Sequence, residues 1–378
     1  MNRSIRELVP DYIRELAPYV PGKPIEEVER ELKTTAIKLA SNENPLGPSP
    51  LAIEAARKAL AGSNRYPDGS GFYLREALAN KHAIPAGNII LGGGSTELID
   101  LSARMVLRPA DCGVTSYGSF PLYYIAIRAA GARFVEVPHR EYHFDLDAMA
   151  QFLPPETKIV FLANPNNPTG TMFDADALDQ FLARVPEHVL TVLDEAYCDF
   201  VQNPKYSRSI ELVRRGRNLI VLRTFSKVYG LAGLRIGYGI GPAELLDEMN
   251  KIRGPFNTSN IAQAAALAAL DDVEHVRRSV ESNRTGLAQL SKGLDELGVK
   301  FVPSYANFML LDFGFETEAL SDEMLRRGVI VRPMRWMGFP NCIRVSVGTH
   351  AENDKFLQVL AELHAPAHQV SHKQQKRV

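Results

Sequence analysis

The stretch Thr224-Phe-Ser-Lys-Val-Tyr-Gly-Leu-Ala-Gly-Leu-Arg235-Ile-Gly-Tyr238 follows the apolar run Asn218-Leu-Ile-Val-Leu222. This run predicts a buried strand, so Lys227 is expected at the carboxyl end of that strand, where open α/β sheets bind ligands. Hydroxyl side chains precede the lysine and Arg235 follows it, so an amine and an anion-binding group share one neighbourhood. A lysine that forms an imine with an aldehyde cofactor needs such surroundings, with a phosphate held close by.

The composition is that of a globular protein large enough for two domains. The chain has 378 residues, of which 45% are hydrophobic and 23% charged, and a formal net charge of −1. The near-neutral charge gives no electrostatic reason to expect nucleic-acid or acidic-membrane partners. No apolar run reaches the roughly 18 residues that span a bilayer, and the first residues lack the apolar core of a secretory signal. Cys112, Cys198 and Cys342 form no disulfide or zinc pattern, which favours a reducing compartment. We therefore expect a cytoplasmic protein.

Strand-like and helical runs alternate through the middle of the chain. Uninterrupted apolar runs occupy residues 88–91, 158–162, 189–193 and 219–222, each followed by a polar segment and a helical pattern. Ser49 and Pro50 predict the start of a helix that extends through residue 61. Apolar runs of this length suit strands buried on both faces, and the alternation predicts an α/β domain with a mostly parallel sheet flanked by helices.

The predicted domains follow from changes in this pattern. Residues 1–38 indicate an N-terminal arm interrupted by prolines, and residues 39–271 the large domain, which ends in an alanine-rich helix. A long polar helix from about residue 273 to 297 then leads to strands near 307–313 and 342–347, which predict a smaller α+β domain over residues 272–365. Residues 366–378 are polar and basic without periodicity, and we expect them to be disordered.

Polar residues that carry chemistry follow the predicted strands. Gly94-Ser95-Thr96 opens a helix, where backbone amides and the helix dipole favour a phosphate, although a glycine turn there is often purely structural. The prolines of Asn164-Pro-Asn-Asn-Pro-Thr-Gly170 would present Asn167 rigidly; the alternative is a capping asparagine in a loop. Asp194, with Tyr197 after it, could pair with a pyridinium nitrogen or simply cap a helix. The glycines around Lys227 permit close backbone approach and argue against a surface lysine. Because the carboxyl ends of parallel strands share one sheet edge, we expect these groups to converge.

Other constellations do not predict a site. The segment His139-Arg-Glu-Tyr-His143 has arginine where a zinc peptidase motif needs glutamate, so we expect a solvated turn and no metal site. Gly237-Tyr-Gly-Ile-Gly241 lacks the spacing of a dinucleotide-binding loop and is interpreted as strand packing. The run Arg214-Arg-Gly-Arg217 is interpreted as a solvated helix end.

These motifs together resemble those of pyridoxal-phosphate-dependent aminotransferases of fold type I, within which the chain is similar to the histidinol-phosphate aminotransferase family. The superfamily resemblance is carried by residues 164–170, 194–197 and 224–238. The narrower resemblance is carried by residues 39–48, 65–69, 328–333 and 343–349, and it extends from about residue 12 to 363. Val228, where relatives have a small residue, and Cys112, where they have an acidic one, depart from the pattern without touching the chemistry.

The resemblance implies a role for each matching residue. Lys227 would be the Schiff-base lysine and proton shuttle, Asp194 would hold the pyridine nitrogen, and Asn167 and Tyr197 would contact the ring's phenolic oxygen. The ring would stack on Phe120, with nearby Tyr117 as the alternative. The phosphate of pyridoxal 5′-phosphate would be held by Ser95, Thr96, Thr224, Ser226 and Arg235, and by Tyr66 of a neighbouring subunit, which implies a homodimer with a shared site. The substrate pocket would comprise Tyr19, Asn257, Arg332 and Arg344, because arginine binds carboxylate and phosphate with two hydrogen bonds.

The activity implied by the resemblance is ping-pong transamination. L-glutamate would give its amino group to the cofactor, and imidazole acetol phosphate would receive it to become L-histidinol phosphate, a step of histidine biosynthesis. An aromatic 2-oxo acid as acceptor is one alternative, because small pocket changes alter specificity by only a few kcal/mol. A phosphoamino-acid decarboxylase on the same scaffold and a non-enzymatic cofactor-binding protein are the others.

Overall fold

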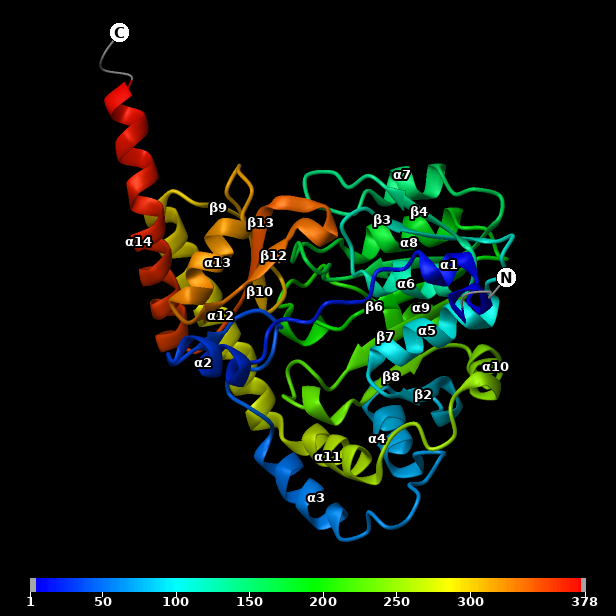
Figure 1. Cartoon of the computed structure of the whole chain (residues 1–378). Helices are drawn as coiled ribbons and strands as arrows, with labels where there is room; N and C mark the ends of the chain where they lie inside the picture. The colour runs from blue at the N-terminus through cyan, green and yellow to red at the C-terminus, as the bar shows by residue number, and fades with distance from the viewer. Residues whose placement is uncertain (1–4, 375–378) are drawn as a thin grey trace.

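The computed structural model describes residues 5–374, with side chains described up to residue 364 (Figure 1). The large domain is built on a seven-stranded sheet with the strand order β2-β8-β7-β6-β5-β3-β4. Its strands are β2 (Ile89–Gly92), β3 (Cys112–Ser116), β4 (Arg133–Val137), β5 (Thr157–Ala163), β6 (Leu190–Asp194), β7 (Leu219–Thr224) and β8 (Gly237–Ile240). All neighbouring strands are parallel except β8, which is antiparallel to both β2 and β7. The predicted α/β fold with a mostly parallel sheet is therefore confirmed.

Helices link the strands and cover the sheet. They are α3 (Pro50–Leu60), α4 (Phe72–His82), α5 (Ser95–Val106), α6 (Leu122–Ala129), α7 (Leu146–Gln151), α8 (Ala175–Arg184), α9 (Ser209–Arg214), α10 (Ala243–Ile252) and α11 (Asn260–Asp271). The expected start of α3 is confirmed, since the Ser49 side chain accepts a hydrogen bond from the Ala52 N–H. Small buried side chains such as Ala262, Ala265 and Ala269 let α11 pack closely on α3.

The central strands hold the core of the large domain. Every residue of β6 is buried, and the apolar residues of β5 and β7 are buried as well, which explains why uninterrupted apolar runs located these strands correctly. Sequence patterning did not locate β3 and β4. Strand β3 has the sequence Cys-Gly-Val-Thr-Ser, with little apolar character, and β4 lies at the sheet edge with partly exposed residues.

The small domain has an antiparallel sheet of order β12-β13-β10-β9. Its strands are β9 (Lys300–Val302), β10 (Phe308–Asp312), β12 (Arg332–Met334) and β13 (Phe339–Ser346), and its helices are α12 (Val273–Leu297), α13 (Glu318–Arg326) and α14 (His350–Gln374). Figure 1 shows this domain beside the large one, with α12 running along their junction. The N-terminal arm contributes η1 (Ile5–Leu8), α1 (Asp11–Arg14), α2 (Ile25–Leu32) and β1 (Ile37–Lys38), and β1 pairs in parallel with β11 (Val329–Ile330) of the small domain.

The C-terminal helix extends into the segment that the sequence analysis expects to be disordered. Helix α14 continues to Gln374, within the segment 366–378, and Figure 1 shows its end extending away from the body. Lys, Gln and His residues extend a nucleated helix at little cost, whereas Pro366, at the start of this segment, removes one helical hydrogen bond. Residues 375–378 lie outside the described residues. Within the described part of the chain, no helix combines the length and apolar character that crossing a membrane requires.

Candidate active site

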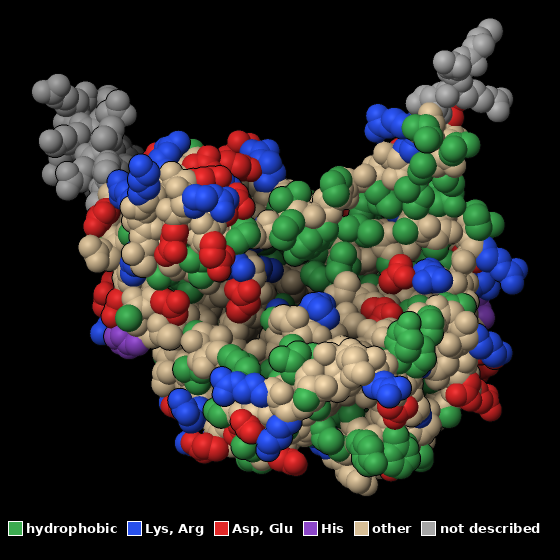
Figure 2. Space-filling model, turned by 60° about the horizontal axis from the view of Figure 1, so that its bottom comes forward, with side chains coloured by type: hydrophobic (Ala, Val, Ile, Leu, Met, Phe, Trp, Pro, Cys, Tyr) green, Lys and Arg blue, Asp and Glu red, His purple; other side chains and the backbone are tan. Residues whose placement is uncertain are grey.

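A cavity of about 260 Å³ lies at the carboxyl ends of β5, β6 and β7, closed on its other side by the small domain and the N-terminal arm. In Figure 2 the surface is hollowed between the small domain, on the left, and the large domain. We call this the first cavity. Most of the residues predicted for the site line it: Tyr19, Ser95, Thr96, Phe120, Asn167, Asp194, Tyr197, Thr224, Ser226, Lys227, Arg235, Arg332 and Arg344.

Lys227 lies on the loop after β7 with its amine inside the first cavity. Its Nζ donates to the backbone oxygen of Asn42 at 3.3 Å and lies 5.4 Å from the centre of the Tyr197 ring. Desolvation lowers the pKa of this amine to about 8, and the positive charges of Arg344 and Arg235 act in the same direction. A substantial fraction of the amine is therefore neutral and nucleophilic near physiological pH.

Asp194 ends β6 with its carboxylate inside the cavity and no cationic partner from the described residues. Its Oδ2 accepts from the Tyr123 hydroxyl at 3.0 Å and its Oδ1 from the Ala196 N–H at 3.1 Å. Desolvation raises the pKa of Asp194 to about 6, although both hydrogen bonds act against this rise. A buried carboxylate in this state gains most from a cation that a ligand supplies, such as a protonated ring nitrogen.

The N-terminal end of α5 forms an anion-binding corner of the cavity. Gly94 precedes the helix at φ 78°, and a Cβ atom there would lie 2.4 Å from the Arg235 Nη2, so only glycine lets this guanidinium approach. Arg235 itself adopts a left-handed conformation and donates to the Ala232 oxygen at 2.9 Å. Thr224 donates to the Ser226 hydroxyl at 2.9 Å, which completes a cluster of hydroxyl, amide and guanidinium groups suited to a phosphate.

Two further arginines reach the cavity from the small domain. Arg344, on β13, donates to the Asn167 side-chain oxygen and to the Ala40 oxygen at 2.7 Å, while its buried Nε has no partner among the described residues. Arg332, on β12, donates to the Val20 oxygen and lies 4.7 Å from the centre of the Trp336 ring. Desolvation lowers the pKa of both guanidinium groups, an effect that a bound anion would offset.

Of the two candidates for the ring-stacking residue, only Phe120 lines the first cavity. Phe120 lines the first cavity, whereas Tyr117 lies outside it and donates its hydroxyl to the Gly338 oxygen at 3.0 Å. This arrangement favours Phe120 as the ring-stacking residue.

Tyr66 and Asn257 do not line the cavity of a single chain. Tyr66 is 83% exposed, and its ring stacks on Phe256 at 4.7 Å. Asn257 donates to the Glu97 carboxylate at 2.6 Å and to the Leu91 oxygen at 3.2 Å. Glu97 also accepts from the Gly93 N–H, so Asn257 lies beside the start of α5 without lining the cavity, whereas Tyr66 is not brought to the other site residues within one chain.

Sequence reasoning assigned no role to Asn42 or Tyr123. Asn42 donates to the Tyr197 hydroxyl at 3.0 Å and accepts from Lys227 through its backbone oxygen, so it connects both groups to the N-terminal segment. Tyr123 is fully buried against Asp194. Asn42 lies within a segment whose resemblance to relatives was noted, and that was the only available signal.

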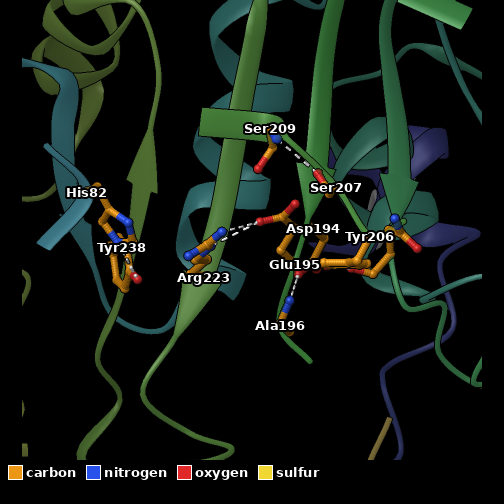
Figure 3. Close-up of polar contacts among 10 residues, drawn as sticks. His82, Asp194, Glu195, Ala196, Tyr206, Ser207, Ser209, Arg223 and Tyr238 are labelled. Carbon is orange, nitrogen blue, oxygen red and sulfur yellow. Dashed lines mark hydrogen bonds and ion pairs between the residues drawn. The ribbon is translucent and has the colours of Figure 1, made fainter. Parts of the chain in front are cut away.

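Arg223 and Glu195 form an ion pair on the side of β6 and β7 that faces away from the first cavity (Figure 3). Arg223 donates through Nε and Nη2 to the Glu195 Oε2 at 3.0 and 2.7 Å, and the Glu195 side chain has no exposed surface. Side chains alternate along a strand, so Asp194 and Thr224 face the cavity while Glu195 and Arg223 face away from it. The pair joins β6 to β7 directly behind the groups of the site.

Comparisons with known proteins agree with this geometry. Residues 34–360 match the family model described as aminotransferase class I and II. The chain is 48% identical to histidinol-phosphate aminotransferase 1 of Nitrosococcus oceani, over 92% of this chain and 94% of that protein. It is 47% identical to the histidinol-phosphate aminotransferase of Akkermansia muciniphila, over 95% and 99% of the two chains. The crystal structure of the Sinorhizobium meliloti histidinol-phosphate aminotransferase in complex with pyridoxal-5′-phosphate is similar with a TM-score of 0.87 and 30% identity, over 94% and 97% of the chains.

Proposed function

The chain belongs to the class I and II aminotransferase family, and we propose that it transfers an amino group from L-glutamate to imidazole acetol phosphate with pyridoxal 5′-phosphate as cofactor. The products are 2-oxoglutarate and L-histidinol phosphate, as expected of a histidinol-phosphate aminotransferase in histidine biosynthesis. The observation that carries the proposal is the convergence of Lys227, Asp194 and Arg235 in one cavity, in a chain whose similarity to these enzymes extends over nearly its whole length.

The residues of the first cavity fit this cofactor. The cluster at the start of α5 matches its phosphate, and Gly94 leaves the space that the cluster needs. Asp194 would pair with the ring nitrogen, Phe120 would stack on the ring, and Asn167 and Tyr197 would contact the phenolic oxygen, which their shared position in the lining supports. The side-chain NH₂ of Asn167 makes no hydrogen bond within the described residues, whereas its oxygen accepts from Arg344, which leaves a donor for that phenolic oxygen.

When bound, pyridoxal phosphate supplies an aldehyde that amines attack and a ring that accepts electron density from the substrate Cα. The residues of the chain itself would position the substrate and transfer protons. Lys227 Nζ, with its lowered pKa, would hold and move a proton next to the substrate, and the Asp194 carboxylate would favour the protonated form of the ring nitrogen. Arg344 and Arg332 bind the anionic groups of the substrates, and the N-terminal arm at Tyr19 closes the cavity from water.

We also propose that the active enzyme is a homodimer whose sites are completed by Tyr66 of the partner. Tyr66, Phe72, Tyr73 and Phe256 are large apolar side chains that are exposed in the single chain, and subunit interfaces commonly bury such side chains. A cytoplasmic location is supported by Cys112, Cys198 and Cys342, none of which forms a disulfide.

An acceptor panel tests the reaction. Purified holoenzyme is incubated with glutamate and either imidazole acetol phosphate or phenylpyruvate, and 2-oxoglutarate, the amine product and carbon dioxide are quantified. The proposal predicts a strong preference for the phosphorylated ketone because Arg332 and Arg344 provide two anion sites. A preference for phenylpyruvate would indicate an aromatic aminotransferase, and carbon dioxide release would indicate a decarboxylase.

Subunit mixing tests the shared site. Lys227→Ala and Tyr66→Ala chains, each impaired alone, are exchanged in equal amounts. If Tyr66 serves the neighbouring site, half of the dimers are hybrids with one intact site, so the mixture regains about a quarter of wild-type activity. A mixture no more active than the mean of its components would contradict the shared site.

A further inference from the structure

A second cavity lies on the other side of Phe120 from the first, also between the two domains. Its volume is about 260 Å³. It is bounded by residues of β3, β4 and α6 in the large domain and by η5 (Arg335–Met337) in the small domain. Its lining includes five aromatic residues, Tyr117, Phe120, Tyr124, Phe134 and Trp336. Tyr117, Tyr124 and Trp336 are also exposed at the surface, so the cavity is open to solvent.

Glu136, on the edge strand β4, is the single charged side chain among the lining residues. Glu136 is exposed to solvent and forms no ion pair within the described part of the chain. Partial desolvation raises the pKa of its carboxyl, with the Gly118 N–H acting in the opposite direction. The first cavity has the reverse character, since its lining includes Lys227, Arg235, Arg332 and Arg344. The first cavity also has the carboxylates Glu43 and Asp194, so its four cations leave an excess of positive charge, whereas the second cavity has a single negative charge.

We propose that the second cavity binds a small planar organic cation, of which an imidazolium ring is the best match. Aromatic faces attract organic cations through their quadrupoles, a planar ring can stack on them, and one carboxylate balances one positive charge. The absence of lysine and arginine from the lining leaves an anion without a partner there. This site is separate from the proposed function, which assigns the first cavity to substrates and cofactor.

Two residues connect an occupant of the second cavity to the first. Phe120 lines both cavities. Trp336 lines the second cavity, and its ring lies 4.7 Å from the Arg332 guanidinium and 5.5 Å from the Tyr19 ring, edge to face. A cation in contact with Trp336 therefore changes the surroundings of an anion-binding arginine. We expect the KM for anionic substrates to change by about fivefold, a typical size for coupling between sites, with a smaller change in kcat.

Trp336 provides a direct measurement because it is the only tryptophan of the chain. The probe is 1,3-dimethylimidazolium chloride, a permanent cation that cannot serve as an amino donor, titrated into holoenzyme against sodium chloride of equal ionic strength. We expect saturable quenching of the tryptophan fluorescence. Glu136→Gln should weaken binding about tenfold, which corresponds to about 1.4 kcal/mol, and Tyr124→Leu should weaken it as well.

The matched control is Glu141→Gln, which removes a carboxylate outside this cavity and should bind the probe as the wild type does. The titration is repeated with saturating 2-oxoglutarate to separate the two cavities. A dissociation constant that changes by no more than about fivefold supports a distinct site. Three outcomes would each overturn the proposal. The dissociation constant of the probe could rise in proportion to the 2-oxoglutarate concentration, Glu136→Gln could bind the probe as tightly as the wild type, or the quenching could fail to saturate. Failure of the proposed function would appear separately, as absent amino transfer with an unchanged titration.

Discussion

Asp194 and Glu195 are adjacent carboxylates that face opposite sides of one strand end. Asp194 faces the first cavity, accepts only neutral donors, and has a pKa raised to about 6. Glu195 faces the rear, is fully buried, and accepts two hydrogen bonds from Arg223. A carboxylate that already has a cation is costly to remove, because its partner is left without a counter-charge, and one without a cation remains available for a cation that a ligand brings. The comparison predicts that substitutions on the cavity face impair the reaction, whereas those on the rear face impair stability.

Lys227→Ala should have the largest effect, and it acts on the cavity face. The variant loses the attacking amine and a general acid–base group, the latter alone being worth ~10²–10⁴-fold, so we expect amino transfer to fall by at least about 10⁴-fold. Borohydride reduction of holoenzyme followed by peptide mapping should locate the cofactor on Lys227 and find none in the variant. Lys251→Ala, on the exposed face of α10, is the control and should behave as wild type. Trapping at another residue would refute the assignment.

Asp194→Asn should lower kcat by about 10²–10³-fold, the loss expected for one preorganised electrostatic contact. The same substitution should not lower the stability of the cofactor-free protein, although it lowers kcat. Because burial raises the pKa of Asp194 from 3.8 to about 6, ionisation destabilises the cofactor-free fold as pH rises through this range, and the cost is complete above it. The amide removes that cost, so the cofactor-free variant should be at least as stable as wild type at pH 8 in thermal unfolding. A large loss of stability would assign Asp194 to the same structural class as Glu195.

Glu195→Gln should reverse this pattern. It leaves Arg223 buried without its partner, which we expect to cost about 3 kcal/mol of unfolding free energy, while kcat per folded molecule changes only a few-fold. Denaturant unfolding and kinetics on the same preparation measure both quantities. Glu274→Gln, which removes an exposed ion pair with Arg277, should leave both unchanged. A catalytic loss as large as that of Asp194→Asn would show that the two faces are not separate.

The smallest expected effect concerns the rate at which an amine-specific reagent labels Lys227 at different pH values. Lys227 has a pKa lowered to about 8, and only the neutral amine reacts, so its labelling rate in the cofactor-free protein should rise about 100-fold from pH 6 to a plateau above pH 9. Surface lysines in the same sample should continue to gain reactivity beyond that plateau. A midpoint near 10.5 would show that the cavity does not desolvate the amine.

The sequence predicted the central strands of the sheet better than its edge, because the two regions differ in burial. Strands β5, β6 and β7 are buried along their length, so their apolar runs revealed them, and their polar ends located Asp194 and Lys227. Edge strand β4 has no such run, and so neither it nor the cavity beside it was anticipated. The segment after β4, expected to be a solvated turn, contains His139 and Tyr142, whose stacked rings contact Phe339 of the small domain.

By itself, the sequence determined strands β2, β5, β6 and β7 of the sheet, approximately where each of them ends, and which chemical groups follow, because burial and backbone geometry act locally along the chain. Only the tertiary structure decided which groups from distant segments meet. It placed Asn42 beside Lys227, Tyr123 beneath Asp194, and Trp336 against Arg332. These contacts depend on how the domains and the N-terminal arm pack together, and no local pattern encodes them.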